Sequence, residues 1–312
     1  MTAKKRVLIT GATGMIGRPL SKALIERGYE VIVLTRNPET APAKTPGAAD
    51  YIQWAPGQPG EWSRHLDDAQ AVISLAGEPL FAGRVSRARY EYANQTRILG
   101  VRGLVKAMRQ AAHSPKVFLC SSSVGIYGFQ GPDDAIVTED TPRGSDYHAL
   151  GNTIWEYEAT PATWMGVRTA LLRTGIVWGP DDGMAYQQLA QFRRGWGGVV
   201  GDGLNWVPWI HIKDEVGIIL HLLEQDGLQG PFNLSAPKPV QYRDYARFMG
   251  DITGKPSDRR MPEFTTQLFM GRVIADMILH NRRMLPQRAL ESGYVFQFPE
   301  AKAALLDLLP RE

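Results

Sequence analysis

Three glycines near the N-terminus have the spacing of a phosphate-binding turn. The apolar segment Val7-Leu8-Ile9 runs directly into Gly11-Ala12-Thr13-Gly14-Met15-Ile16-Gly17, in which the glycines stand three residues apart. One glycine permits a tight turn, another lets the backbone approach a pyrophosphate, and the last lets the following helix pack closely on the strand. The start of that helix offers free N–H groups to a phosphate. We therefore predict that these residues bind a dinucleotide; the alternative is a glycine-rich turn without a ligand.

The residue after the next predicted strand indicates which dinucleotide is bound. A protein that binds NAD usually has Asp or Glu about 20 residues after the glycines, where it holds the ribose 2′-hydroxyl. This sequence has Thr35-Arg36-Asn37 there, and Arg36 lies 36 − 17 = 19 residues beyond Gly17. A guanidinium suits a 2′-phosphate, and the neighbouring sequence holds no carboxylate to repel one. We predict NADP in preference to NAD; otherwise Arg36 is an ordinary solvated arginine.

The elements that position these residues alternate between strands and helices, which predicts a Rossmann-type doubly wound parallel sheet. The predicted strands are Arg6–Thr10, Glu30–Thr35, Tyr51–Trp54, Ala71–Leu75, Lys116–Cys120 and Ala170–Val177, and the predicted helices are Pro19–Arg27, Arg87–Ala112 and Asn152–Met165. Shorter elements separated by glycine and proline follow. We expect a dinucleotide-binding domain over residues 1–180, with contributions from 205–235, and a smaller mixed α/β lobe over 181–312.

Composition narrows the classes of function. A net charge of +3 over 312 residues lacks the dense basic stripe of a nucleic-acid-binding protein. The apolar run Val216–Leu223 is too short to span a bilayer. A single cysteine, Cys120, excludes an intrachain disulfide and fits a reducing compartment. No His, Cys, Asp or Glu cluster has metal-ligand spacing, so we predict no metal. We expect a cytosolic protein with a small-molecule substrate and neither a nucleic-acid nor a membrane partner.

The sequence resembles the extended short-chain dehydrogenase/reductase superfamily. Within it, the chain is most similar to the NAD-dependent epimerase/dehydratase-like branch of nucleoside-diphosphate sugar epimerase-like proteins with a small C-terminal domain. The resemblance covers nearly the whole chain. It rests on GATGMIGRPL at 11–20, VISLAGEPL at 72–80, LLRTGIVWGP at 171–180, WIHIKD at 209–214 and, most specifically, RRMLPQRALESGYVFQFPE at 282–300.

This resemblance implies several further positions of the site. Leu75, Ala76 and Gly77 should lie under the adenosine and pyrophosphate, and Gly175–Pro180 should pass beside the nicotinamide. Thr174, Gly175 and Ile176 are therefore expected to contact the cofactor. His211 and Asp214 should lie near the cleft. Extended members often dimerise through a four-helix bundle, which here would use the helices Arg87–Ala112 and Asn152–Met165 of a homodimer.

The resemblance also implies the proton-transfer chemistry. The superfamily uses a Ser or Thr after the fifth strand and a Tyr with a Lys four residues later, whose ammonium lowers the tyrosine pKa from about 10. Ser123, with Ser122 adjacent, matches the serine, and Tyr147 matches the tyrosine. The fourth residue after Tyr147 is Gly151, so the lysine charge is missing. Either serine could instead simply bond to the backbone at a strand end.

Two functions remain open at this point. A complete cofactor turn together with Ser123 and Tyr147 favours an oxidoreductase or epimerase that acts on a small polar or sugar-like carbonyl or alcohol. Gly151 favours an NADP-binding protein with little catalysis, such as a redox sensor or a scaffold. A glycine-rich segment contains Trp206 and Trp209, which either stack on a substrate ring or pack between the lobes.

Overall fold

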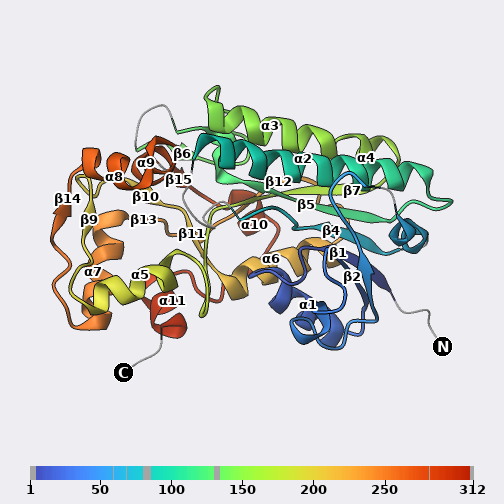
Figure 1. Cartoon of the computed structure of the whole chain (residues 1–312), viewed down its shortest axis with the longest axis horizontal. Helices are drawn as coiled ribbons and strands as arrows, with labels where there is room; N and C mark the ends of the chain where they lie inside the picture. The colour runs from blue at the N-terminus through green and yellow to red at the C-terminus, as the bar shows by residue number, and fades with distance from the viewer. Residues whose placement is uncertain are drawn as a thin grey trace.

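A seven-stranded parallel sheet forms the centre of the molecule (Figure 1). The computed structural model describes residues 5–58, 60–67, 69–79, 86–129, 134–280 and 282–309. The strand order is β12 (Gly230–Leu234), β7 (Arg168–Thr174), β5 (Val117–Ser123), β4 (Ala71–Ser74), β1 (Arg6–Thr10), β2 (Glu30–Thr35) and β3 (Asp50–Gln53). The chain moves outward from β1 to β3 and then returns to β4, so the order reverses between β1 and β4. Ligands bind outside the carboxyl ends of the strands at such a reversal. The predicted doubly wound sheet is confirmed.

Helices cover both faces of the sheet (Figure 1). One layer consists of α2 (Arg87–Gln110), α3 (Tyr147–Ala159) and α4 (Pro161–Trp164), and the opposite layer contains α1 (Gly17–Glu26) and α6 (Ile212–Glu224). Side chains alternate along each strand. Leu8 therefore joins the buried cluster under α2, whereas Val7 and Ile9 join the cluster under α1 and α6. Burial on both faces explains why the strands are continuously apolar in sequence.

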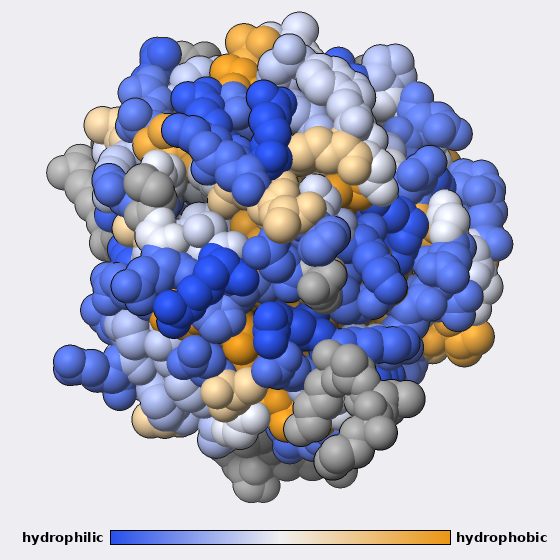
Figure 2. All heavy atoms as spheres, turned by 90° about the vertical axis from the view of Figure 1, so that its right-hand side faces the viewer, coloured by the Kyte–Doolittle hydropathy of each residue, from blue (hydrophilic) through white to orange (hydrophobic). Residues whose placement is uncertain are grey.

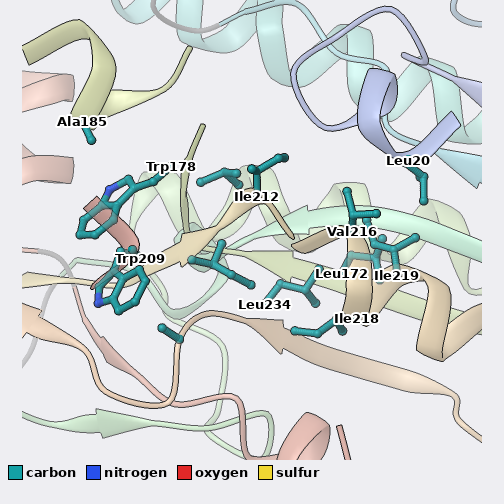
Figure 3. Close-up of a cluster of buried hydrophobic side chains, with 14 of the residues drawn as sticks. Leu20, Leu172, Trp178, Ala185, Trp209, Ile212, Val216, Ile218, Ile219 and Leu234 are labelled. Carbon is teal, nitrogen blue, oxygen red and sulfur yellow. The ribbon is translucent and has the colours of Figure 1, made fainter. Parts of the chain in front are cut away.

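A stacked pair of indoles links the sheet to the rest of the chain (Figure 3). Trp178 ends β8 (Ile176–Trp178) and Trp209 begins β11 (Trp209–His211), and these two strands pair in parallel. The ring centroids are 4.6 Å apart, and both side chains are fully buried. Close by, Val216 and Ile219 of α6 join the same hydrophobic cluster as Leu172 of β7. Both tryptophans therefore belong to the core.

The part of the molecule outside the central sheet and its two helix layers is built from helices and two-stranded sheets. Its helices are α5 (Met184–Arg193), α7 (Tyr242–Thr253), α8 (Glu263–Met270), α9 (Arg272–Leu279), α10 (Gln287–Glu291) and α11 (Ala301–Leu308). Three strand pairs are β9 (Val199–Val200) with β14 (Arg260–Met261), β10 (Trp206–Val207) with β13 (Val240–Gln241), and β6 (Ile136–Val137) with β15 (Arg283–Met284). The 3-10 turns are η1 (Ala41–Ala43), η2 (Glu61–Leu66) and η3 (Val124–Tyr127).

Several predicted boundaries differ from the structure by a few residues, and two of these differences have a clear local cause. The predicted strand Ala170–Val177 is divided into β7 and β8 because Gly175 interrupts it. A Cβ on Gly175 would lie 2.1 Å from the carbonyl oxygen of Pro208, so only glycine allows this close approach. The predicted helix Asn152–Met165 begins earlier, at Tyr147, because Asp146 caps it by accepting a 2.9 Å hydrogen bond from the N–H of Ala149.

The surface at the right-hand end of Figure 1 is mainly hydrophilic, and its apolar side chains form small separate patches (Figure 2). Scattered patches of this kind are ordinary on a folded protein. Within the described ranges, none of the helices combines the length and the apolar character needed to cross a membrane.

Candidate functional site

The turn between β1 and α1 depends on glycine at both of its ends. Gly11 has φ +74°, and a Cβ there would lie 2.7 Å from the backbone carbon of Leu75. A Cβ on Gly17 would lie 2.2 Å from the carbonyl oxygen of Gly11. Gly14 differs, because a Cβ there would approach only that same oxygen, at 3.3 Å. Gly11 and Gly17 therefore shape the turn, while Gly14 leaves its outer side open.

The start of α1 fits an anionic group. The N-cap residue Ile16 forms no side-chain cap, and the first turn of the helix contains no acidic residue. Its free N–H groups and dipole can therefore serve a phosphate. Thr13 is half-buried and lies in the same turn. The side chain of Met15 reaches the segment after Trp178, with its Sδ 3.4 Å from where a Cβ on Gly179 would be. These residues fit the pyrophosphate of a dinucleotide.

The segment after β4 lies beside this turn. The N–H of Leu75 donates to the carbonyl oxygen of Thr10 at 3.1 Å, and the N–H of Ala76 donates to the Thr10 hydroxyl at 3.3 Å. Gly77 lies against Arg97, whose Nε would be 2.7 Å from a Cβ at that position. The predicted cofactor-binding residues on β1, β4 and α1 thus gather at the point where the strand order reverses.

Arg36 has a carboxylate partner that the sequence does not reveal. It follows β2 at the edge of this site, and its Nη1 donates to Oε1 of Glu78. We expected no carboxylate beside Arg36, and this expectation is wrong because Glu78, 42 residues away in sequence, is carried there by the segment after β4. The Arg36 side chain is 65% exposed, so its other donors remain accessible to a ligand.

A cavity of about 200 Å³ opens at the carboxyl ends of β5 and β7. Of the predicted site residues it brings together Ser122, Ser123, Thr174 and Gly175. Ser123 and Thr174 are neighbours in the sheet register, so their side chains meet at the same edge. Ile176 lies just beyond, in β8, where it pairs with Trp209. The remaining lining residues are Tyr90, Asn94, Arg97, Gly125, Phe129, Asn152, Trp155 and Met277.

The two candidate serines have different partners. The hydroxyl of Ser122 donates to Oε1 of Glu156 at 2.7 Å, and Glu156 also receives two hydrogen bonds from Arg173, at 2.9 and 3.1 Å. All three residues are buried. Ser123 instead accepts a hydrogen bond from the N–H of Gly125 at 3.2 Å, which leaves its O–H free to donate. Ser122 is therefore committed to an internal ion pair, and Ser123 is the serine available to a ligand.

Tyr147 does not line the cavity. Among the described residues its buried hydroxyl has no hydrogen-bond partner. The guanidinium of Arg87 lies 4.7 Å from its ring centroid. Burial raises the pKa of Tyr147, the nearby Glu91 carboxylate raises it further, and Arg87 opposes both effects.

The space beside Gly151, where a lysine side chain would begin, is occupied by the side chain of Asn94. A Cβ on Gly151 would lie 2.6 Å from Nδ2 of Asn94 on α2. The amide of Asn94 thus fills the start of the path that a lysine side chain would take. Asn94 is neutral, so it cannot supply the lysine's charge.

His211 and Asp214 lie away from the cavity and hold the end of the chain. The ring of His211 is fully buried and stacks on Phe298 with a centroid distance of 3.9 Å. The buried carboxylate of Asp214 accepts hydrogen bonds from the Tyr294 hydroxyl and from the N–H groups of Gln297 and Phe298. The expectation that both residues lie near the cleft is wrong, because the C-terminal segment packs against them.

The two tryptophans also separate into different roles. Trp209 packs in the core against Trp178, so for this residue the packing alternative is the right one. Trp206 is half-buried, donates from its Nε1 to Asp134 at 3.0 Å and lies under the guanidinium of Arg283.

Sequence reasoning missed Tyr90, Asn94, Arg97 and Asn152, although all four line the cavity. The first three lie on α2 with spacings of four and three residues, which place them on one face of a helix. This helical spacing is the sequence signal from which the three cavity residues of α2 could have been predicted. Thr96 lies on the same helix, and its hydroxyl accepts a hydrogen bond from the N–H of Glu78 at 3.3 Å.

Comparison with known proteins agrees with this geometry. Residues 7–235 match the NAD dependent epimerase/dehydratase family, and residues 261–308 match a domain of unknown function, DUF1731. The human epimerase family protein SDR39U1 is 32% identical over 97% of this chain and 99% of its own length. The Bacillus subtilis epimerase family protein YfhF is 29% identical over 97% of both chains.

Solved structures show the same likeness. The crystal structure of human SDR39U1 (isoform 2) with NADPH superposes with a TM-score of 0.83 at 31% identity, over 97% of this chain and 98% of that one. UDP-glucose 4-epimerase from Thermotoga maritima has a TM-score of 0.76 at 21% identity, over 96% and 97% of the chains, and shares the fold. The predicted resemblance is confirmed: the chain belongs to the NAD dependent epimerase/dehydratase family.

Proposed function

We propose that this protein is an NADP(H)-dependent oxidoreductase, or an epimerase-like enzyme, that acts on a small polar or sugar-like carbonyl or alcohol. The observation that carries the proposal is one continuous sheet edge that holds both parts of such a site. The glycine turn and Arg36 lie on one side of the strand reversal, and the cavity with Ser123 lies on the other. A relative that is 31% identical over almost its whole length was crystallised with NADPH, which supports the choice of cofactor.

The chain's own residues have distinct tasks in this proposal. The N–H groups of α1 hold the pyrophosphate, and Arg36 holds the 2′-phosphate through the donors that Glu78 leaves accessible. Bound NADPH would supply a hydride to the substrate. Ser123 donates its free O–H to the substrate oxygen, and the small cavity limits the substrate to a compact group.

The test measures binding before turnover. Fluorescence titration should give a lower Kd for NADPH than for NADH, and NADPH absorbance should then fall with at least one member of a panel of small aldehydes, ketones and sugar-like carbonyls. Ser123→Ala should abolish that turnover while NADPH still binds. Equal Kd values for the two cofactors would reject NADP.

A protein that binds NADPH with little catalysis is the second candidate, because Gly151 carries no charge. The discriminating variant is Gly151→Lys in an Asn94→Ala background, since Asn94 otherwise fills the space that the lysine needs. Turnover that appears only in this double variant would favour the binding protein, whereas turnover in the natural chain favours the enzyme.

We also propose a homodimer through the outer side of α2, α3 and α4. These helices pack together and expose large apolar side chains, which are Tyr92, Leu150, Ile154, Tyr157 and Trp164. A second copy would bury this strip in a four-helix bundle. Sedimentation should show a dimer that Leu150→Lys with Tyr157→Lys converts to a monomer; a monomeric natural chain would reject the proposal.

A further inference from the structure

The phenol that faces the cavity belongs to Tyr90 rather than to Tyr147. Tyr90 lies on the first turn of α2, is only 5% exposed, and lines the same cavity as Ser123 and Thr174. The ring of Tyr147 lies behind it, with the two ring centroids 5.4 Å apart. The charges nearest to the Tyr147 hydroxyl are those of Arg87 and Glu91, at the outer end of α2.

Polar groups of α2 and α3 surround the Tyr90 hydroxyl. The side-chain amides of Asn94 and Asn152 line the cavity beside Tyr90, and both lower the pKa of its hydroxyl. Asn152 is held in place because its Nδ2 donates to the carbonyl oxygen of His148 at 2.8 Å. The two amides beside the phenol are neutral and cannot take its proton.

Arg97 supplies the positive charge of the cavity. Among the described residues that line the cavity, it is the one charged side chain. Its Nη2 donates to the carbonyl oxygen of Glu78 at 3.0 Å, and its guanidinium lies 5.5 Å from the ring centroid of Trp155. An arginine stays protonated in proteins. The cation that Gly151 cannot supply from α3 is therefore present on α2.

The charges that face Tyr90 determine the direction in which it can transfer a proton. Burial raises the pKa of Tyr90, Asn94 and Arg97 oppose that rise, and Asp146 adds to it. The ring of His148, 4.9 Å away, has a pKa lowered by burial and is neutral near pH 7. A phenol in these surroundings is protonated at neutral pH, so it suits an acid rather than a base.

We propose that Tyr90 is the proton donor of this site, that Arg97 is the positioning residue that replaces the missing lysine, and that the site reduces a carbonyl. The inference rests on the proposed function. In the step, the carbonyl carbon receives a hydride from reduced nicotinamide, and its π electrons move to the oxygen. That oxygen takes the proton of the Tyr90 hydroxyl, whose O–H electron pair remains on the phenolate. Solvent water then returns a proton to Tyr90.

The first test compares two conservative variants that keep the aromatic ring. Tyr90→Phe should lower kcat for carbonyl reduction by about 100-fold or more, the size of a general-acid contribution, with the Kd for NADPH unchanged. Tyr147→Phe should stay within about threefold. The opposite pattern, with Tyr147→Phe inactive and Tyr90→Phe active, would overturn the proposal.

A pH profile tests Arg97. Loss of its positive charge in Arg97→Gln raises the pKa of Tyr90, so the alkaline fall in kcat should move to higher pH, whereas Arg97→Lys should restore the natural profile. Arg97 with a merely structural role would lower kcat at every pH by the same factor, and that result would reject its assignment.

A second measurement needs no turnover. The tyrosines are replaced by 3-fluorotyrosine, and the ¹⁹F resonances of residues 90 and 147 are assigned from the two phenylalanine variants. Addition of NADPH should shift the resonance of residue 90 and leave that of residue 147 in place; the reverse would overturn the proposal. If no carbonyl in the panel is reduced, the proposed function fails, and the resonance shift still decides which phenol faces the cofactor.

Discussion

Arg36 and Glu78 form an ion pair across the edge of the cofactor site, joining the end of β2 to the segment after β4. Glu78 is mostly covered, whereas Arg36 is largely exposed. The carboxylate thus fixes the position of the guanidinium and places a negative charge near the expected 2′-phosphate. These two effects oppose one another, and variants can separate them.

Substitutions at this pair should change the preference between NADPH and NADH. Arg36→Ala should weaken NADPH binding by about 10- to 100-fold, the value of a charge-assisted hydrogen bond, with NADH almost unaffected. Glu78→Gln should tighten NADPH, because the repulsion is removed while a hydrogen bond to Arg36 remains. Isothermal titration of both cofactors measures the two ratios, and equal losses for NADPH and NADH in Arg36→Ala would contradict this account.

Gly17→Ala should abolish NADPH binding and lower the midpoint of thermal unfolding. The added Cβ would lie 2.2 Å from the carbonyl oxygen of Gly11, so the turn must open. Gly28→Ala is the matched control, because that residue has φ +80° but open space around its Cβ position. The control should lose about 1–2 kcal/mol of stability and keep its cofactor. Similar NADPH affinities in both variants would disprove the role of Gly17.

The two serines should respond in opposite ways. Ser122→Ala removes a hydrogen bond to the buried Glu156 carboxylate, so it should cost about 1.5–3 kcal/mol in unfolding free energy and leave NADPH binding intact. Ser123→Ala should cost less stability and remove turnover. Arg173→Met should be the most damaging of the three, at about 3–5 kcal/mol, since it removes the buried partner of the Glu156 carboxylate and leaves only Arg143, at 3.5 Å, beside it. Urea unfolding gives all three values, and a stable Arg173→Met variant would refute the ion-pair argument.

Glu215 should make the protein less stable as the pH rises above neutrality. Burial raises the pKa of Glu215 from 4.5 to about 8, although a hydrogen bond from the Thr174 hydroxyl opposes the rise. Between these two values the folded state holds a proton that the unfolded state has released. The unfolding free energy should therefore fall with increasing pH, by up to about 1.4 kcal/mol per pH unit.

The titration of His211 changes the unfolding free energy in the opposite direction, and it does so at lower pH. Burial lowers the pKa of His211 from 6.5 to about 4, with Asp307 opposing the shift. The stability that the neutral imidazole of His211 contributes is fully present above pH 6.5 and is lost as the pH falls toward 4. Between pH 4.5 and pH 6.5, Glu215 and His211 change the unfolding free energy in opposite directions as the pH rises, so the two effects offset each other. The decline in unfolding free energy caused by Glu215 should therefore be seen above pH 6.5. Glu215→Gln should match the natural chain near pH 5 and exceed its stability at pH 8; parallel urea-unfolding curves would contradict the assignment.

Asp214→Asn should loosen the C-terminal segment. The carboxylate accepts from Tyr294 and from two backbone N–H groups, and an asparagine would place an NH₂ group against one of these donors. We expect a loss of at least about 2 kcal/mol and faster amide exchange at residues 294–298. Asp307→Asn, at a partly exposed position, is the control and should leave that exchange slow. Unchanged exchange in Asp214→Asn would show that other contacts hold the segment.

Local patterns were sufficient to predict the sheet and the glycine turn. The strands are short, continuously apolar and separated by turn residues, and the glycine spacing is confined to seven positions. The Arg36–Glu78 pair and the Tyr90 face could not be predicted in the same way, because both depend on segments that are distant in sequence. Asp214 shows the same limit: a buried carboxylate near a strand end looks like a site residue until its partners, 80 or more positions away, are known.

The short pairing of β6 with β15 has a consequence for how the chain matures. Met284 from the C-terminal segment lies in one buried cluster with Val124 and Ile126, which directly follow the candidate serines. Asn233 likewise donates to the carbonyl oxygen of Leu285. During synthesis, the first 230 residues would leave the ribosome with this buried cluster unfinished, since a domain folds as a unit. The packing behind Ser123 is then completed only after residue 284 has been synthesised, and a chain that stops shortly before residue 284 would form the sheet without this packing.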